Sequence, residues 1–187
     1  MHHLPARILL ISALLAATAL TAVSGAVAGS TLQHRSTRAR FVTPAAYLHA
    51  PRSTGAITYD RTAVPVGSWA RVTQSRNKWG GMDVALRVSH LRAGTRYRAE
   101  VHVGACGARP GSSGRAFQNG PSTQDYAANE FWLNFRTDGS GDASVLTRHY
   151  WGIARHQHAR SVVIHTPGSR SVVAACVTVP FVSRWFQ

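Results

Sequence analysis

The 187-residue sequence is poor in acidic residues, lysine and cysteine. Its seven aspartates and glutamates are scattered singly, so it lacks the neighbouring carboxylates with which glycosidases cleave sugars. It also lacks the Gly-x-Ser-x-Gly motif of one large class of hydrolases. The two cysteines, Cys106 and Cys176, are too far apart for a Cys-x-x-Cys redox centre.

What the sequence has in excess is arginine. The formal net charge is +14, and all of the basic residues except Lys78 are arginines. Such a surface attracts small anions and anionic polymers, although an arginine-rich codon usage would produce the same charge without any partner. Neither a recognition helix nor alternating aromatic and basic residues are present, so we do not expect a nucleic-acid partner.

The first 28 residues have the pattern of a signal peptide. Arg7 precedes the apolar run ILLISALLAATALTAV, and the small residues SGAVAGS follow, which predicts cleavage after Ala28. The alternative is an uncleaved membrane anchor, but serines and threonines interrupt the run and favour the signal. The sequence therefore predicts export to the extracellular space or the cell envelope.

Residues 29–54 are rich in Ser, Thr, Arg and Ala without a sustained period, which predicts a flexible spacer. Residues 55–187 are then one domain. Because cysteines pair in an oxidising compartment, we expect a disulfide between Cys106 and Cys176. It would close a loop of about 70 residues and contribute about 4 kcal/mol in the chain-entropy model.

The pattern from Gly55 onward predicts an all-β domain. In MDVALRV, Met82, Val84, Leu86 and Val88 alternate with polar or small residues, as in a strand with one buried face. Eight such segments are expected, at 56–60, 68–76, 82–88, 95–103, 129–137, 143–150, 161–165 and 171–181. No segment predicts a convincing helix, so the architecture is a β-barrel or sandwich. A long loop rich in Gly, Ser, Pro and Asn covers 105–128.

Three segments occur in an order that resembles a known family. EVHVGACG (100–107), SVVIH (161–165) and ACVTVPF (175–181) are similar to segments of the copper–zinc superoxide dismutases, in particular their secreted actinobacterial-type members. The resemblance implies an eight-stranded Greek-key β-barrel whose long loop is tied down by the disulfide. It also implies a copper–zinc centre that acts on superoxide.

The ligand positions implied by the resemblance are only partly kept. The family's His-x-His pair falls on Glu100 and His102, and a further copper histidine falls on His165. The bridging histidine falls on Ala116, and the arginine that guides superoxide falls on Val173. Two of four copper histidines therefore remain.

The zinc ligands that the resemblance implies would lie between residues 118 and 131. This segment contains no histidine, and its acids are Asp125 and Glu130, so we do not expect zinc. A residual copper site at His102, His165 and Glu100 is the cofactor prediction, with superoxide a substrate only if copper is bound. We expect dismutase activity to be lost or slight.

Less specific interpretations remain open. A Glu-x-His pair on a strand is commonly a solvated polar face. The sequence HQH, His156 to His158, has chelating spacing, but in an arginine-rich connection it is more typical of solvated loop histidines. The functions left open are a non-catalytic envelope module that binds anionic polymers or a protein, an enzyme with weak or altered copper chemistry, and a copper-capturing domain.

Overall fold

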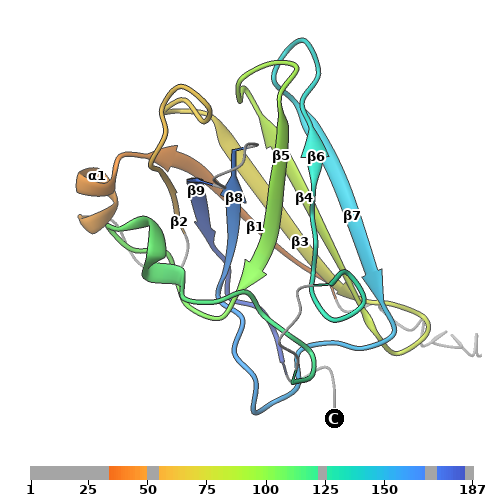
Figure 1. The fold of residues 1–187 in the computed structure, drawn as a ribbon. Helices are drawn as coiled ribbons and strands as arrows, with labels where there is room; N and C mark the ends of the chain where they lie inside the picture. The colour runs from red at the N-terminus through yellow and green to blue at the C-terminus, as the bar shows by residue number, and fades with distance from the viewer. Residues whose placement is uncertain (1–33, 50–54, 122–125, 167–171, 184–187) are drawn as a thin grey trace, which may run out of the picture. The chain divides into compact units, whose positions relative to one another are not determined.

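A computed structural model describes residues 34–49, 55–121, 126–166 and 172–183 (Figure 1). The chain divides into two units, Met1–Ser30 and Thr31–Gln187, and the described residues all belong to the second. The expected signal peptide, residues 1–28, lies outside the described residues. Within the described ranges, no helix is long and apolar enough to cross a membrane.

The described residues form one nine-stranded sheet in the order β6-β5-β8-β9-β2-β1-β3-β4-β7. The strands are β1 (His34–Val42), β2 (Gly55–Thr58), β3 (Trp69–Arg76), β4 (Met82–Ser89), β5 (Arg96–His102), β6 (Phe135–Arg136), β7 (Ala143–His149), β8 (Ser161–His165) and β9 (Val173–Thr178). Two short helices accompany them, α1 (Pro44–Leu48) and the 3-10 helix η1 (Pro110–Ser113).

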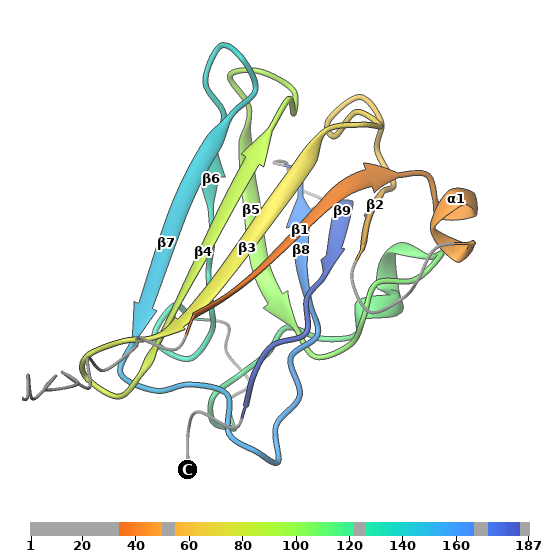
Figure 2. The same ribbon diagram turned by 180° about the vertical axis from the view of Figure 1, so that it is seen from behind.

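Several neighbours in the sheet are far apart in sequence, as in a Greek key. β4 pairs with β7, β5 with β8 and β2 with β9, all antiparallel. β6 and β7, at the two ends of the strand order, contact each other, so the sheet is a nearly closed barrel (Figures 1 and 2). The expected all-β barrel is confirmed, with nine strands rather than eight.

The alternation of β4 explains how the sequence builds the core. Met82, Val84, Leu86 and Val88 are at most 1% exposed, as expected from their spacing. The inward residues of β5 and β8 fill the same core from the opposite side of the barrel. Glu100 is on the other face of β5, where the site lies.

The expected flexible spacer, residues 29–54, is wrong for its described part. β1 pairs with β3 over seven residues, from His34↔Ser75 to Arg40↔Trp69. Its inward phase includes Thr37 and the fully buried Phe41, but its other phase is polar and arginine-rich. Because β1 lacks a strong hydrophobic alternation, its sequence does not indicate a strand. Pairing with β3 is what buries its inward residues.

A helix also forms where none was expected. α1 begins directly after Thr43, whose hydroxyl accepts a hydrogen bond from the Ala46 N–H at 3.2 Å. Pro44 occupies the first turn, where its missing N–H costs no hydrogen bond. Tyr47 then anchors the helix, because its hydroxyl lies 2.7 Å from Thr178 Oγ1 on β9.

The predicted disulfide is present and fastens the loop after β5 to the barrel. It joins Cys106 to Cys176 of β9, with a Cα–Cα distance of 5.7 Å. The Cys106 N–H also donates to Thr178 Oγ1 at 3.2 Å. Tyr47, Ile57 and Val163 pack around the disulfide as a small cluster on the outer face of the sheet.

Tyr59 adds a pH-sensitive contact to this loop. Its hydroxyl donates to the Gly107 carbonyl at 2.6 Å. Burial of the hydroxyl raises the pKa of Tyr59 to about 12. Because the fold favours the neutral phenol, the stabilisation is complete below the ordinary tyrosine pKa of about 10 and is lost as the pH rises to about 12.

We therefore expect the free energy of unfolding of the wild type to fall more steeply between about pH 10 and about pH 12 than that of Tyr59→Phe. Urea unfolding at a series of pH values measures both slopes. Parallel pH dependences of the two proteins would contradict the assignment.

Candidate metal site

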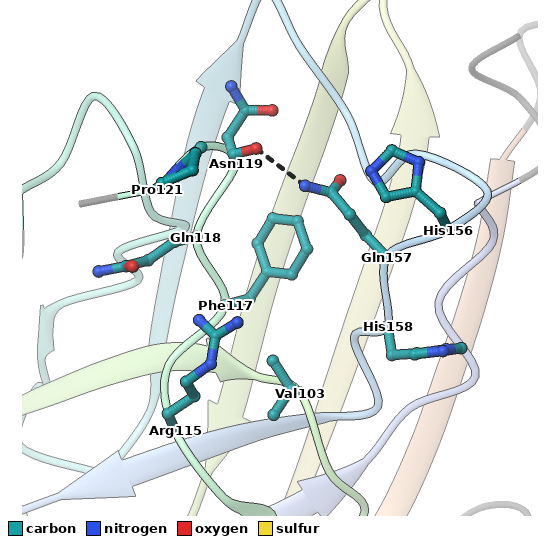
Figure 3. Close-up of a pocket in the computed structure, with 10 residues that line it drawn as sticks. Val103, Arg115, Phe117, Gln118, Asn119, Pro121, His156, Gln157 and His158 are labelled. Carbon is teal, nitrogen blue, oxygen red and sulfur yellow. Dashed lines mark hydrogen bonds between the residues drawn. The ribbon is translucent and has the colours of Figure 1, made fainter.

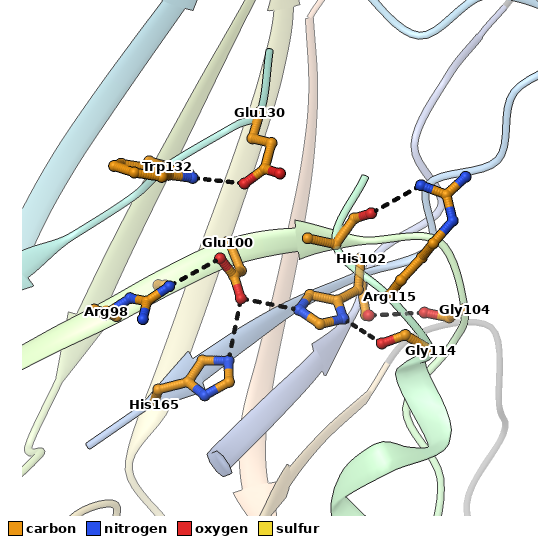
Figure 4. Close-up of polar contacts among 12 residues, drawn as sticks. Arg98, Glu100, His102, Gly104, Gly114, Arg115, Glu130, Trp132 and His165 are labelled. Atoms are coloured by element: carbon orange, nitrogen blue, oxygen red, sulfur yellow. Dashed lines mark hydrogen bonds and ion pairs between the residues drawn. The ribbon is translucent and has the colours of Figure 1, made fainter. Parts of the chain in front are cut away.

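The candidate site lies where β5 and β8 run antiparallel on the outer face of the barrel (Figure 4). Glu100 and His102 are two apart on β5, on opposite sides of the buried Val101, so both project from one face. His165 ends β8 and is in register with Arg98. It is therefore the diagonal neighbour of Glu100 across the strand pair.

The three side chains that the sequence singled out come together. Glu100 Oε1 lies 3.4 Å from Nε2 of His102 and 3.4 Å from Nε2 of His165. One ligand atom from each residue lies within 4.8 Å of the others, and in the described part of the chain this is the one such group of three or more. The side chains are only 10–13% exposed.

A backbone carbonyl determines which nitrogen of His102 faces the cluster. Nδ1 of His102 lies 2.7 Å from the Gly114 carbonyl oxygen, which can only accept, so Nδ1 carries a proton. In the neutral ring Nε2 then has a free lone pair, and this atom is directed at Glu100. Metal-binding histidines typically have this arrangement, with the second nitrogen donating to a carbonyl.

The Gly114 carbonyl reaches His102 through a glycine-specific backbone conformation. Gly114 has φ of 68° and ψ of −152°, a backbone conformation that residues other than glycine strongly disfavour. The loop is also held by hydrogen bonds from the Gly104 N–H to Ser113 O and from the Val103 N–H to Arg115 O, at 2.8 and 3.1 Å. The sequence analysis did not predict this orienting role of Gly114. The glycine itself was the only indication of it in the sequence.

His165 is a buried imidazole without a hydrogen-bond partner. Its Nε2 is 3.4 Å from Glu100 Oε1, but the directions of the two groups do not make a hydrogen bond, and both ring nitrogens are unsatisfied among the described residues. A buried polar group left in this state costs about 1–3 kcal/mol. A metal ion bound at Nε2 would remove part of this cost.

The carboxylate of Glu100 is strongly held in its charged form. The pKa of Glu100 lies far below its ordinary value, mainly because the His102 ring, and then the His165 ring, stabilise the carboxylate when they carry a proton on Nε2, while burial opposes the shift. Arg98 Nη2 lies 3.6 Å from the other oxygen, Oε2. The carboxylate is therefore available as an anionic ligand throughout the neutral pH range.

The three groups together favour a bound cation. In the neutral tautomer that Gly114 imposes, a lone pair of His102 faces a negative oxygen of Glu100, which is repulsive unless a proton or a metal ion lies between them. His165 adds a second nitrogen. Two imidazoles and one carboxylate suit copper or zinc, so the residues fit a single metal ion.

The positions expected for the bridging histidine, the guiding arginine and the zinc ligands carry other residues. Ala116, at the expected bridging position, forms an isolated antiparallel bridge with His102, and Val173 is in register with His165. Of the acids in the expected zinc segment, Asp125 lies outside the described residues. The fully buried Glu130 accepts hydrogen bonds from Gln118 at 2.9 Å and Trp132 at 2.7 Å.

The HQH segment lines a separate pocket. His156, Gln157 and His158 border a cavity of about 540 Å³ together with Arg115 and the loop at 117–121 (Figure 3). Gln157 Nε2 donates to the Asn119 carbonyl at 2.8 Å, while both histidines are exposed. Among the described residues, no third ligand-bearing side chain joins them, so the structure does not bring this pair into a metal cluster.

Fold and site together define a disulfide-linked β-barrel domain with a carboxylate and two imidazoles on one strand pair. Solved structures similar to it are copper–zinc superoxide dismutases and proteins like them. One is the Cu/Zn superoxide dismutase from Brucella abortus, with 13% identity, a TM-score of 0.47, and coverage of 78% of this chain and 99% of that chain. Another is a SOD-like protein from Bacillus subtilis, with 12% identity, a TM-score of 0.43, and coverage of 58% and 88%.

No family model matches the sequence, and no curated protein matches it. What this chain can do therefore has to be inferred from its own residues.

The unsatisfied imidazole leads to a stability prediction. His165→Leu removes two buried ring nitrogens that have no hydrogen-bond partner among the described residues, and it puts an apolar side chain of similar size in place of the imidazole. We expect the metal-free variant to be more stable than the wild type by about 1 kcal/mol in urea unfolding. A loss of stability of that size instead would show that His165 is satisfied without a metal.

Proposed function

We propose that this chain is an exported superoxide dismutase-like domain that binds a single metal ion, copper in the first place, without catalysing dismutation. Glu100, His102 and His165 are its ligands. The observation that carries the proposal is the pair of imidazoles whose Nε2 atoms face one carboxylate oxygen at 3.4 Å, while the Gly114 carbonyl holds Nδ1 of His102.

The chain's own residues hold and orient the ion. The Gly114 carbonyl keeps Nε2 of His102 free, and Arg98 neutralises the oxygen of Glu100 that faces away from the histidines. A copper ion, when bound, supplies one-electron redox chemistry.

Rapid dismutation requires more than this ligand set provides. The resemblance calls for four imidazoles, a bridging imidazole to zinc and a guiding arginine, whereas this chain has two imidazoles, Ala116 and Val173 at those positions. A carboxylate in place of an imidazole also changes the geometry and the relative stability of the two copper oxidation states. These substitutions support capture or storage of the ion in place of turnover.

Export is the cellular part of the proposal. The sequence pattern of residues 1–28 supports it, and so does the disulfide, since such bonds persist in oxidising compartments.

The metal site has a direct test. We expect the purified protein to bind one Cu(II) per chain, with two nitrogen ligands in its electron paramagnetic resonance spectrum, and to show no superoxide-dependent turnover. The double variant His102→Ala/His165→Ala should lose this binding. The matched control His156→Ala/His158→Ala removes two exposed histidines and should retain it. Equal copper uptake by both double variants would exclude the site, and two ions per chain or rapid turnover would exclude the proposed function.

A gain of function tests the geometry independently. Residues opposite each other in an antiparallel pair lie on one face, with Cβ atoms about 4.5–5.5 Å apart, and Ala116 is opposite His102. We expect Ala116→His to add a ligand and raise copper affinity about tenfold, which corresponds to about 1.4 kcal/mol. Ala116→Leu, the control of similar bulk, should bring no increase. If neither variant changes affinity, the ion does not bind beside His102.

A further inference from the structure

Three arginines form a continuous row across the outer face of the barrel formed by β1, β3 and β4. Arg38 of β1 is directly opposite Arg71 of β3, and Arg71 is directly opposite Arg87 of β4. The strands that carry them lie side by side (Figure 2). All three side chains are exposed.

This arginine row has no counter-charge in the described part of the chain. No hydrogen bond or ion pair within these ranges joins the three guanidinium groups to a protein acceptor. Arg38 lies over the indole of Trp69, with Cζ 4.5 Å from the ring centroid. Asp83, the acid on this face of β4, is instead opposite Arg148 of β7 and pairs with it at 3.4 Å.

Like charges placed directly opposite each other destabilise a sheet. Here two successive cross-strand pairs are both Arg–Arg, so folding brings three positive charges into a line that the rest of the face does not neutralise. A bound polyanion would remove this repulsion. We propose that the arginine row binds a linear acidic polysaccharide that lies across the strands.

The arrangement of the row favours this occupant. Neighbouring strands are about 4.8 Å apart, so the spacing of the guanidinium groups suits a polymer whose anionic groups are close together and regularly spaced. The next row on the same face begins with Ser36 opposite Thr73, whose hydroxyls are 3.4 Å apart and can hydrogen-bond to sugar hydroxyls.

Other anionic partners fit less well. A membrane surface would be expected to meet a group of exposed apolar side chains, but Leu146 of β7 is the one large exposed hydrophobic residue on the described strands of this face. Single-stranded nucleic acid would need aromatic rings free for stacking, and Arg38 covers Trp69. The inference is independent of the metal site, which lies on β5 and β8.

Dextran sulfate is the probe, with neutral dextran of the same length as its control. We expect the protein to bind dextran sulfate, more weakly as salt rises, and not to bind dextran. The double variant Arg71→Ser/Arg87→Ser should lose about tenfold in affinity, since it removes two of the three charges of the row and each exposed ion pair contributes modestly. Its matched control, Arg96→Ser/Arg136→Ser, removes another exposed cross-strand arginine pair and should lose much less.

Further measurements separate charge from folding and sugar from other anions. Arg71→Lys/Arg87→Lys should keep most of the binding, and Arg71→Ser/Arg87→Ser should melt at a higher temperature than the wild type at low salt. Equal losses in the two serine variants would overturn the proposal. Row-dependent binding that is tighter to single-stranded DNA or to anionic lipid vesicles than to dextran sulfate would overturn the choice of a polysaccharide.

Discussion

The hydrogen bond from His102 Nδ1 to the Gly114 carbonyl is the contact on which the chemistry of the site depends. Without it, His102 could protonate Nε2 and donate to Glu100, and the cluster would be an ordinary ion pair on a strand surface. With it, Nε2 faces the carboxylate and is the nitrogen that can hold either a proton or a metal ion. Nε2 of His165 faces the same oxygen of Glu100 from the other strand, so a single positively charged ion could contact both imidazoles.

This contact in turn depends on how the long loop is fastened. The disulfide joins the loop to β9, and Thr178 of that strand accepts from the Cys106 N–H. The close approach of Gly104 to Ser113 then leads the chain back to β5. A Cβ at position 104 would lie 2.8 Å from the Ser113 carbonyl oxygen, so only glycine permits this path. The loop that the disulfide fastens is therefore the same loop that orients His102.

The sequence predicted much of this fold because alternation is a direct consequence of strand geometry. The buried residues of β4 and β5 followed from their spacing alone, and Glu100, His102 and His165 were singled out before their positions were known. β1 was missed because its outward residues are arginines and its burial depends on β3. β6 is much shorter than the segment 129–137 expected for it, because before Phe135 this segment pairs with β5 only through the isolated bridge between Trp132 and Glu100. The arginine row depends on the register of the strands, and the role of Gly114 depends on the path of the loop. Neither can be predicted from the hydrophobic periodicity of the sequence.

The central claim concerns the protonation of one nitrogen, and nitrogen-15 nuclear magnetic resonance of the imidazoles tests it most directly. In metal-free protein, we expect Nδ1 of His102 to carry a proton, and Nε2 to be the nitrogen at which a metal ion can replace a proton. Addition of a diamagnetic ion such as Zn²⁺ or Cu(I) should shift the Nε2 resonances of His102 and His165 and leave the Nδ1 proton of His102 in place. A His102 ring without a proton on Nδ1, or one whose Nε2 resonance the metal does not change, would contradict the proposed site.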